Sequence, residues 1–208
     1  MSGVGRWDVI TVGNLSRNRY WGEDESQPVR PTLCTTTLIT GKGYRLLVDP
    51  SCQEEARMAA ELDRRTGLKL DAIDAVFITH EHGDHHYGLH CFPRAQWLAA
   101  PAVAEVMNAA GQYARSIAPI ETRLFGDVEV LATPGHTLAH HSLRFLWEGK
   151  VVVVAGDAVM TRDFWRDRQG FFNSVNMELA GRTIARLAET TDIVVPGHDN
   201  YFLAGRRG

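Results

Sequence analysis

The sequence of 208 residues has few cysteines and no long apolar run. Its three cysteines, Cys34, Cys52 and Cys91, are odd in number and far apart, which argues against a disulfide framework and favours a reducing compartment. No stretch approaches the roughly 18 consecutive apolar residues of a membrane span. The N-terminal MSGVGRWDVITVG lacks the charged head and apolar run of a signal peptide. We therefore expect a cytoplasmic protein.

The chain also has no excess of positive charge. The chain has 22 Lys and Arg against 25 Asp and Glu, a net charge of -3. This balance argues against nucleic acid or an anionic membrane as a partner, because both require clustered basic residues. The hydrophobic content of 44% is typical of a globular protein, and no linker or low-complexity tract interrupts the chain. The sequence therefore predicts one domain over residues 1–208.

Short segments rich in β-branched residues and bounded by Gly, Pro or Asp predict strands along the whole chain. They are residues 8–13, 35–40, 44–49, 74–79, 96–100, 128–133, 141–147, 150–157 and 192–197. Gly-Lys-Gly at 41–43 and Glu-Gly at 148–149 predict hairpin turns between neighbouring segments.

Three segments, 51–67, 101–113 and 176–191, predict helices. The first has Ser51 and Glu54 in capping-box spacing, and it carries Met58 and Leu62 on one face before Gly67. The second begins with Pro101, and the third places Ala180, Ile184 and Leu187 on one stripe. Strands and helices in both halves of the chain predict an α/β domain with helices outside a sheet-rich core.

Two polar stretches, residues 15–31 and 161–173, predict long loops that carry aromatic side chains. Such loops either cover a binding site or pack against their own domain or a second copy in a homodimer. The candidate substrate-binding residues on them are Tyr20, Trp21, Phe164 and Trp165.

Residues 79–90, THEHGDHHYGLH, hold five of the nine histidines. His80 and His82 are two apart, so in extended chain their side chains point to the same side. Asp84 and His85 follow, close enough for a second metal ion. Neutral imidazole and carboxylate are the ligands of catalytic zinc and similar divalent ions. The segment therefore predicts a metal site, the alternative being a solvated loop that happens to contain histidine.

Three further expected strands end in a ligand-type residue. Segment 128–133 runs through Pro-Gly into His136, segment 150–157 ends in Asp157, and the last runs through Pro-Gly into His198. Polar groups that terminate buried strands gather along one edge of a sheet, where α/β folds build their sites.

Together the motifs THEHGDHH, TPGH, AGD and PGH, in this order, resemble the metallo-β-lactamase superfamily over nearly the whole chain. The resemblance implies a four-layer αββα sandwich, with two mixed β-sheets face to face and helices on the outer faces. It also implies two metal ions at one sheet edge. The implied ligands are His80, His82 and His136 for one ion, Asp84, His85 and His198 for the other, and Asp157 as the bridge between them. His86, His90, His140 and His141 are not matched by the motifs.

Two divalent ions at such a site can share a water molecule and lower its pKa toward neutrality, which gives a bridging hydroxide as the nucleophile. One ion can also polarise the oxygen of the substrate. Asp84 is then the catalytic residue that orients the hydroxide and passes its proton to the leaving group. Two Zn²⁺ ions are expected, although Fe or Mn suits the same ligands. We expect a dinuclear zinc-dependent hydrolase that acts on a small-molecule substrate.

Two smaller groups are the most similar in local sequence. TPGHTLAHHSL, GDAVMTRDFW and PGHD resemble the N-acyl homoserine lactonases, which carry a Tyr three residues after the bridging Asp, where this chain has Met160. Methionine donates no hydrogen bond, so Met160 is a candidate pocket residue without the role of that Tyr, for which Tyr20 and Tyr201 are alternatives. VVVAGD and VVPGH resemble metallo-β-lactamase domain-containing protein 1, which is associated with nuclease activity.

The expected reaction is hydrolysis of an ester, lactone or thioester. Phosphodiester cleavage, as a phosphodiesterase or ribonuclease on the same two metals, is the first alternative. A mononuclear iron persulfide dioxygenase, with iron on the residues His80, His136 and Asp157, is the second. A non-catalytic binding protein is the third, although none of the implied ligand positions is lost.

Overall fold

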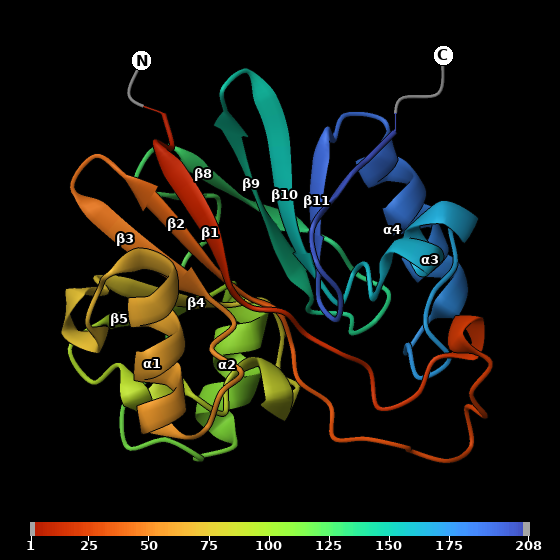
Figure 1. The fold of residues 1–208 in the computed structure, drawn as a ribbon, viewed down its shortest axis with the longest axis horizontal. Helices are drawn as coiled ribbons and strands as arrows, with labels where there is room; N and C mark the ends of the chain where they lie inside the picture. The colour runs from red at the N-terminus through yellow and green to blue at the C-terminus, as the bar shows by residue number, and fades with distance from the viewer. Residues whose placement is uncertain (1–2, 206–208) are drawn as a thin grey trace.

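The computed structural model describes residues 3–205 as two six-stranded sheets that face each other, with helices on their outer sides (Figure 1). The first sheet has the order β1 (Arg6–Thr11), β2 (Thr36–Gly41), β3 (Tyr44–Val48), β4 (Ala75–Ile78), β5 (Gln96–Ala99) and β6 (Ala118–Pro119). The second has the order β12 (Phe202–Leu203), β11 (Ile193–Pro196), β10 (Lys150–Gly156), β9 (His141–Trp147), β8 (Val128–Ala132) and β7 (Arg123–Leu124).

Both sheets are mixed. The first pairs antiparallel from β1 to β3 and parallel from β3 to β6, and the second is antiparallel except for the parallel pair β10 and β11. Parallel neighbours need crossover connections, which contain α-helices except between β4 and β5, where residues 79–95 form only two short 3-10 turns. The four-layer αββα sandwich expected from the sequence is confirmed.

Helices α1 (Glu55–Thr66) and α2 (Pro101–Ala109) lie on the side of the first sheet, and α3 (Arg162–Asp167) and α4 (Met177–Ala188) on the side of the second (Figure 1). The expected apolar faces are confirmed, because Met58 and Leu62 of α1 are fully buried and the stripe of α4 is buried against the second sheet. The left-handed Gly67 ends α1 as expected.

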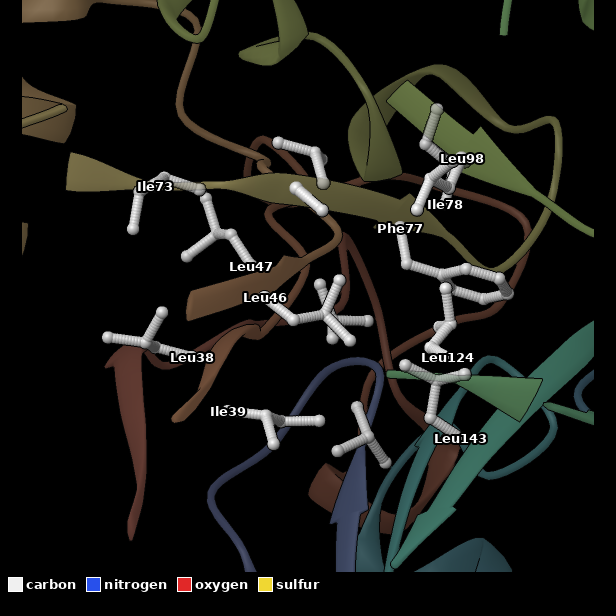
Figure 2. Close-up of a cluster of buried hydrophobic side chains, with 14 of the residues drawn as sticks. Leu38, Ile39, Leu46, Leu47, Ile73, Phe77, Ile78, Leu98, Leu124 and Leu143 are labelled. Carbon is white, nitrogen blue, oxygen red and sulfur yellow. The ribbon is translucent and has the colours of Figure 1, made fainter. Parts of the chain in front are cut away.

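The largest apolar cluster lies between the sheets and extends to the inner face of α1. Figure 2 shows Phe77 of β4 next to Leu124 of β7 and Leu143 of β9, so side chains from the two sheets meet directly. Removal of this apolar surface from water, at about 25 cal/mol per Å², is the main stabilising contribution to the sandwich. The ends of the strands can therefore carry polar groups without loss of the fold.

Two local expectations are wrong. Helix α1 begins at Glu55, and its N-cap Glu54 makes no side-chain cap bond. Ser51 does not cap the helix, because its hydroxyl accepts a hydrogen bond from the backbone N of Cys34 at 2.8 Å. The segment 161–173 is not all loop, since its first part is α3, which has a buried apolar side.

Several elements differ in extent from the expectation. The second helix ends at Ala109, because Gly111 soon after it has φ of +62°. The strands β6, β7 and β12 have two residues each and carry no alternating pattern that a sequence could reveal. Within residues 3–205, no helix has both the length and the apolarity to span a membrane. The assignment of 1–208 to one domain stays a prediction.

Candidate metal centre

The expected ligands all follow the ends of buried strands, and they meet at one end of the sandwich. His80 comes just after β4, His136 after β8, Asp157 after β10 and His198 after β11. Two backbone hydrogen bonds join the sheets at this end, from the N of His141 to the O of Thr79 at 3.0 Å and from the N of Thr35 to the O of Gly197 at 2.6 Å. The ligand-bearing strand ends are therefore held together by the backbone itself.

One group of potential ligands consists of His80, His82, His136 and Asp157, with ligand atoms within 4.8 Å of one another. Nε2 of His136 lies 2.9 Å from Nδ1 of His82 and 3.2 Å from Oδ2 of Asp157. Nε2 of His80 lies 3.7 Å from the same carboxylate oxygen. Imidazole nitrogens and one carboxylate oxygen thus converge on a single point.

A second group consists of Asp84, His85 and His198. Nε2 of His85 and Nε2 of His198 each lie 3.1 Å from Oδ1 of Asp157. Oδ2 of Asp84 lies 3.6 Å from the same nitrogen of His198 and 3.9 Å from that of His85. Asp157 therefore faces the first group mainly with Oδ2 and the second mainly with Oδ1.

Hydrogen bonds to Nδ1 orient three of the five rings, those of His80, His85 and His198. The hydroxyl of Thr79 donates to Oδ2 of Asp49 at 2.8 Å, so it accepts from Nδ1 of His80 at 3.1 Å. Nδ1 of His85 donates to the same Asp49 oxygen at 2.8 Å, and Nδ1 of His198 donates to a backbone carbonyl at 3.0 Å. Each of these rings turns Nε2 toward Asp157, and Nε2 of His198 is within hydrogen-bonding distance of its Oδ2 at 3.3 Å. A metal ligand oriented through its other nitrogen has the same arrangement.

Buried polar atoms without a hydrogen-bond donor mark the centre. Nε2 of His80, Nε2 of His85 and Oδ1 of Asp157 are buried and make no hydrogen bond. Such groups are costly to bury unless a partner satisfies them, and lone pairs that face one another require a cation. The residues present therefore fit divalent metal ions.

The charge balance agrees with this fit. Burial lowers the pKa of His80 well below its usual value and that of His136 to about 4, so both rings are neutral at pH 7, as metal ligands must be. Burial opposes protonation of His85 and His198 as well, but the negative groups around them, including Asp157, override it and raise the pKa of both. The centre thus stabilises positive charge.

A cavity of about 350 Å³ opens over the centre. Its floor is formed by His82, Asp84, Asp157 and His198. Its walls are formed by Leu15, Ser16, Arg17, Thr32, Tyr87, Met160, Phe171, Phe172 and Asn173. The volume is that of a site for a small organic molecule.

Of the five candidate substrate-binding residues, Met160 lines this cavity, and Tyr20, Trp21, Phe164 and Trp165 do not. Phe164 is fully buried beneath the wall, in an apolar cluster that also includes Met160 and contacts Tyr20. Trp165 belongs to another cluster on the outer side of the second sheet, and Trp21 is 45% exposed. On α3 both Phe164 and Trp165 face the interior of the layer.

Sequence reasoning missed two kinds of site residue. Asp49, at the end of the expected strand 44–49, is hydrogen-bonded to Thr79 and His85. The one feature of the sequence that could have indicated this role is its position at the end of a buried strand. Arg17 and Asn173 line the cavity from loops whose path no pattern in the sequence reveals.

The unmatched histidines include two with defined structural contacts. The ring of His86 is hydrogen-bonded through Nδ1 to the hydroxyl of Tyr113 at 2.6 Å. His140 is fully buried, and its Nδ1 bonds to the hydroxyl of Thr133 at 2.8 Å. They support the loops around the ligands.

Comparison with known proteins places the chain in a family. The family model of the metallo-beta-lactamase superfamily matches residues 29–198. The chain therefore belongs to the metallo-β-lactamase superfamily, whose members are metal-dependent hydrolases. No curated protein matches the sequence.

Solved structures show the same fold at low sequence identity. An N-acyl homoserine lactone hydrolase with N-hexanoyl-L-homoserine at its catalytic metal center is 22% identical, with a TM-score of 0.71, over 95% of this chain and 94% of that one. A single-residue variant of a B. thuringiensis protein, with N-decanoyl-L-homoserine at its active site, is 22% identical (TM-score 0.70) over 95% and 94%. A hydrolase of the beta lactamase superfamily is 16% identical (TM-score 0.68) over 100% and 92%.

Proposed function

We propose that the protein is a dinuclear metal-dependent hydrolase that cleaves an ester, lactone or thioester in a small molecule. One observation carries the proposal: the two oxygens of Asp157 face two separate groups of ligand atoms, at 3.1 Å on one side and 3.2 to 3.7 Å on the other. A carboxylate in this position is suited to bridge two cations. The fold shared with lactone hydrolases supports a carbonyl substrate.

The two ions, which we expect to be zinc, would be held as the two groups suggest. His80, His82 and His136 would hold one, Asp84, His85 and His198 the other, and Asp157 both. Bound there, a pair of divalent ions activates water at neutral pH and polarises the substrate carbonyl. Ser16 is the one serine among the lining residues and no cysteine is among them, and the Ser16 hydroxyl makes no hydrogen bond to a histidine or carboxylate among residues 3–205 that would activate it.

Asp84 is the proposed catalytic residue. Its carboxylate lines the floor of the cavity and lies between His198 and His85, so it reaches both the centre and a molecule in the cavity. It can orient the attacking water and carry the proton to the leaving group. No other carboxylate lines the cavity except Asp157, which is engaged with the histidines on both sides.

Met160 lines the cavity at the position where the N-acyl homoserine lactonases carry a tyrosine. Met160 supplies apolar surface and no donor. Neither Tyr20 nor Tyr201 lines the cavity, whereas Tyr87 does. If a phenol assists the substrate carbonyl, Tyr87 is the residue in position for it.

The first experiment is elemental analysis of protein purified without added metal, followed by assays on lactones, thioesters and phosphodiesters. We expect two zinc ions per chain and turnover of a carbonyl substrate. Turnover of phosphodiesters alone would favour the nuclease alternative. A single iron, with oxygen uptake on a persulfide, would overturn the proposal in favour of the dioxygenase.

Asp84→Asn tests the mechanism itself. The kcat should fall by a factor of at least about 10² through loss of general acid-base catalysis, while the ion on His80, His82 and His136 is retained. Asp71→Asn is the control, because Asp71 is an exposed carboxylate paired with Arg94. Near-full activity of Asp84→Asn would remove its assigned role. The cytoplasmic location and the homodimer stay predictions.

A further inference from the structure

Arg17 is the one arginine on the wall of the cavity that holds the candidate metal centre. Its guanidinium carbon lies 4.7 Å from the centre of the Phe172 ring, which lines the same cavity. Its Nε is buried and makes no hydrogen bond. The side chain is therefore held by an aromatic face, with its hydrogen-bonding groups uncommitted.

The other arginines in the same segment do have partners. Arg19 donates to the side chain of Gln169, and Arg30 is paired with Glu23. Among residues 3–205, Arg17 has no ion pair and no side-chain hydrogen bond. The carboxylate of Asp24 accepts a hydrogen bond from the backbone N of Ser26, which lowers its pKa more than the charge of Arg17 does.

Polar side chains near Arg17 are uncommitted too. Ser16, Thr32 and Asn173 line the cavity, and none of their side chains is hydrogen-bonded to another described residue. A cation with unused donors beside hydroxyl and amide groups is a recognition surface for an oxyanion. The planar guanidinium can donate two parallel hydrogen bonds to a carboxylate or a phosphate. Because stacking on Phe172 already restricts the Arg17 side chain, it loses less conformational entropy when it binds such a group.

We infer that the substrate carries an oxyanion group, a carboxylate or a phosphate, besides the bond that is cleaved, and that Arg17 binds this group. The inference rests on the proposed function, because it assumes that the scissile carbonyl lies over the floor formed by Asp84 and Asp157. It makes Arg17 the residue that separates anionic from neutral substrates. The apolar wall at Met160 and Phe171 then contacts the carbon chain between the two ends.

Binding to the zinc-loaded protein tests this without turnover. Isothermal titration calorimetry compares α,ω-dicarboxylates, from succinate to suberate, with monocarboxylates of the same chain length. Both series share one carboxylate, so a difference in affinity is due to the second carboxylate alone. A parallel series of ω-phosphonocarboxylates distinguishes phosphate from carboxylate. The proteins are wild type, Arg17→Met, Arg17→Lys, and Arg19→Met as a control from the same segment outside the cavity wall.

We expect one chain length at which the doubly charged ligand binds wild type about tenfold more tightly than its monocarboxylate, as a charge-assisted pair provides. The preference should disappear in Arg17→Met, persist in part in Arg17→Lys and be unchanged in Arg19→Met. Equal binding of both ligands by wild type at every length, or a preference that survives in Arg17→Met, would overturn the inference and leave Arg17 as packing for Phe172.

The proposed function has a separate readout in the same proteins. For anionic esters KM should rise about tenfold in Arg17→Met and stay at the wild-type value in Arg19→Met, whose side chain does not line the cavity. Failure to hydrolyse any ester, with the dicarboxylate preference intact, would reject the hydrolase and support the anion site.

Discussion

Oδ2 of Asp49 lies 2.8 Å from Nδ1 of His85, and both side chains are buried. Asp49 directly follows β3 and has φ of +52°, a conformation that non-glycine residues rarely adopt. Its carboxylate also accepts hydrogen bonds from the N and the hydroxyl of Thr79, both at 2.8 Å. The carboxylate of Asp49 therefore positions both Thr79, where the histidine loop begins, and the ring of His85.

Asp49→Asn should weaken the binding of the ion held by His85. The amide cannot accept all of these bonds with the strength of a carboxylate, and loss of such an outer partner lowers metal affinity by about 10- to 100-fold. Competitive zinc titration measures the affinity, with Asp71→Asn as the exposed control. Wild-type affinity for both ions in Asp49→Asn would show that the orientation of His85 does not depend on this bond.

The two groups of potential ligands could be found in the sequence because each member lies within a few residues of a buried strand end, and strand ends can be recognised in a sequence. Asp49 and His85 illustrate the limit, since they are 36 positions apart and their contact depends on the parallel pairing of β3 with β4. The aromatic residues of 161–173 show another limit. Their polar neighbours resemble a loop, yet α3 forms because Phe164 and Trp165 find apolar clusters contributed by other segments.

Trp165→Ala should destabilise the fold and leave substrate affinity nearly unchanged. Trp165 is 6% exposed, and its ring lies 5.8 Å from that of Phe202 in a cluster outside the cavity wall. Loss of a buried Trp lowers the free energy of unfolding by about 3 to 5 kcal/mol. Chemical denaturation measures the free energy of unfolding, and KM from steady-state kinetics reports the effect on the substrate.

Trp21→Ala is the comparison for Trp165→Ala. Trp21 is 45% exposed and contacts the guanidinium of Arg30, so its loss should lower the free energy of unfolding by about 1 kcal/mol or less. A large rise in KM with unchanged stability in Trp165→Ala would instead place that ring against the substrate.

Gly197→Ala should displace the carboxylate of Asp157. A Cβ built on Gly197 would lie 2.0 Å from Oδ1 of Asp157, so Asp157 or the end of β11 must move. Because Asp157 serves both groups of ligands, zinc affinity should fall by at least about tenfold at both positions. Gly205→Ala is the matched control, because a Cβ there meets no atom within 4 Å. Two ions bound with wild-type affinity in Gly197→Ala would contradict the close packing at Asp157.

The three thiols should be unreactive in the folded protein. Cys34, Cys52 and Cys91 are all buried, and burial raises the pKa of Cys34 to about 12 and that of Cys91 to about 11. A pKa above its usual value keeps the thiol protonated at pH 8, and the thiolate is the reactive form. Reaction with Ellman's reagent at pH 8 should therefore be slow in native protein and should release three equivalents per chain in denaturant. One equivalent released rapidly from native protein would mean that one cysteine is exposed, and Cys→Ser variants at each position would identify it.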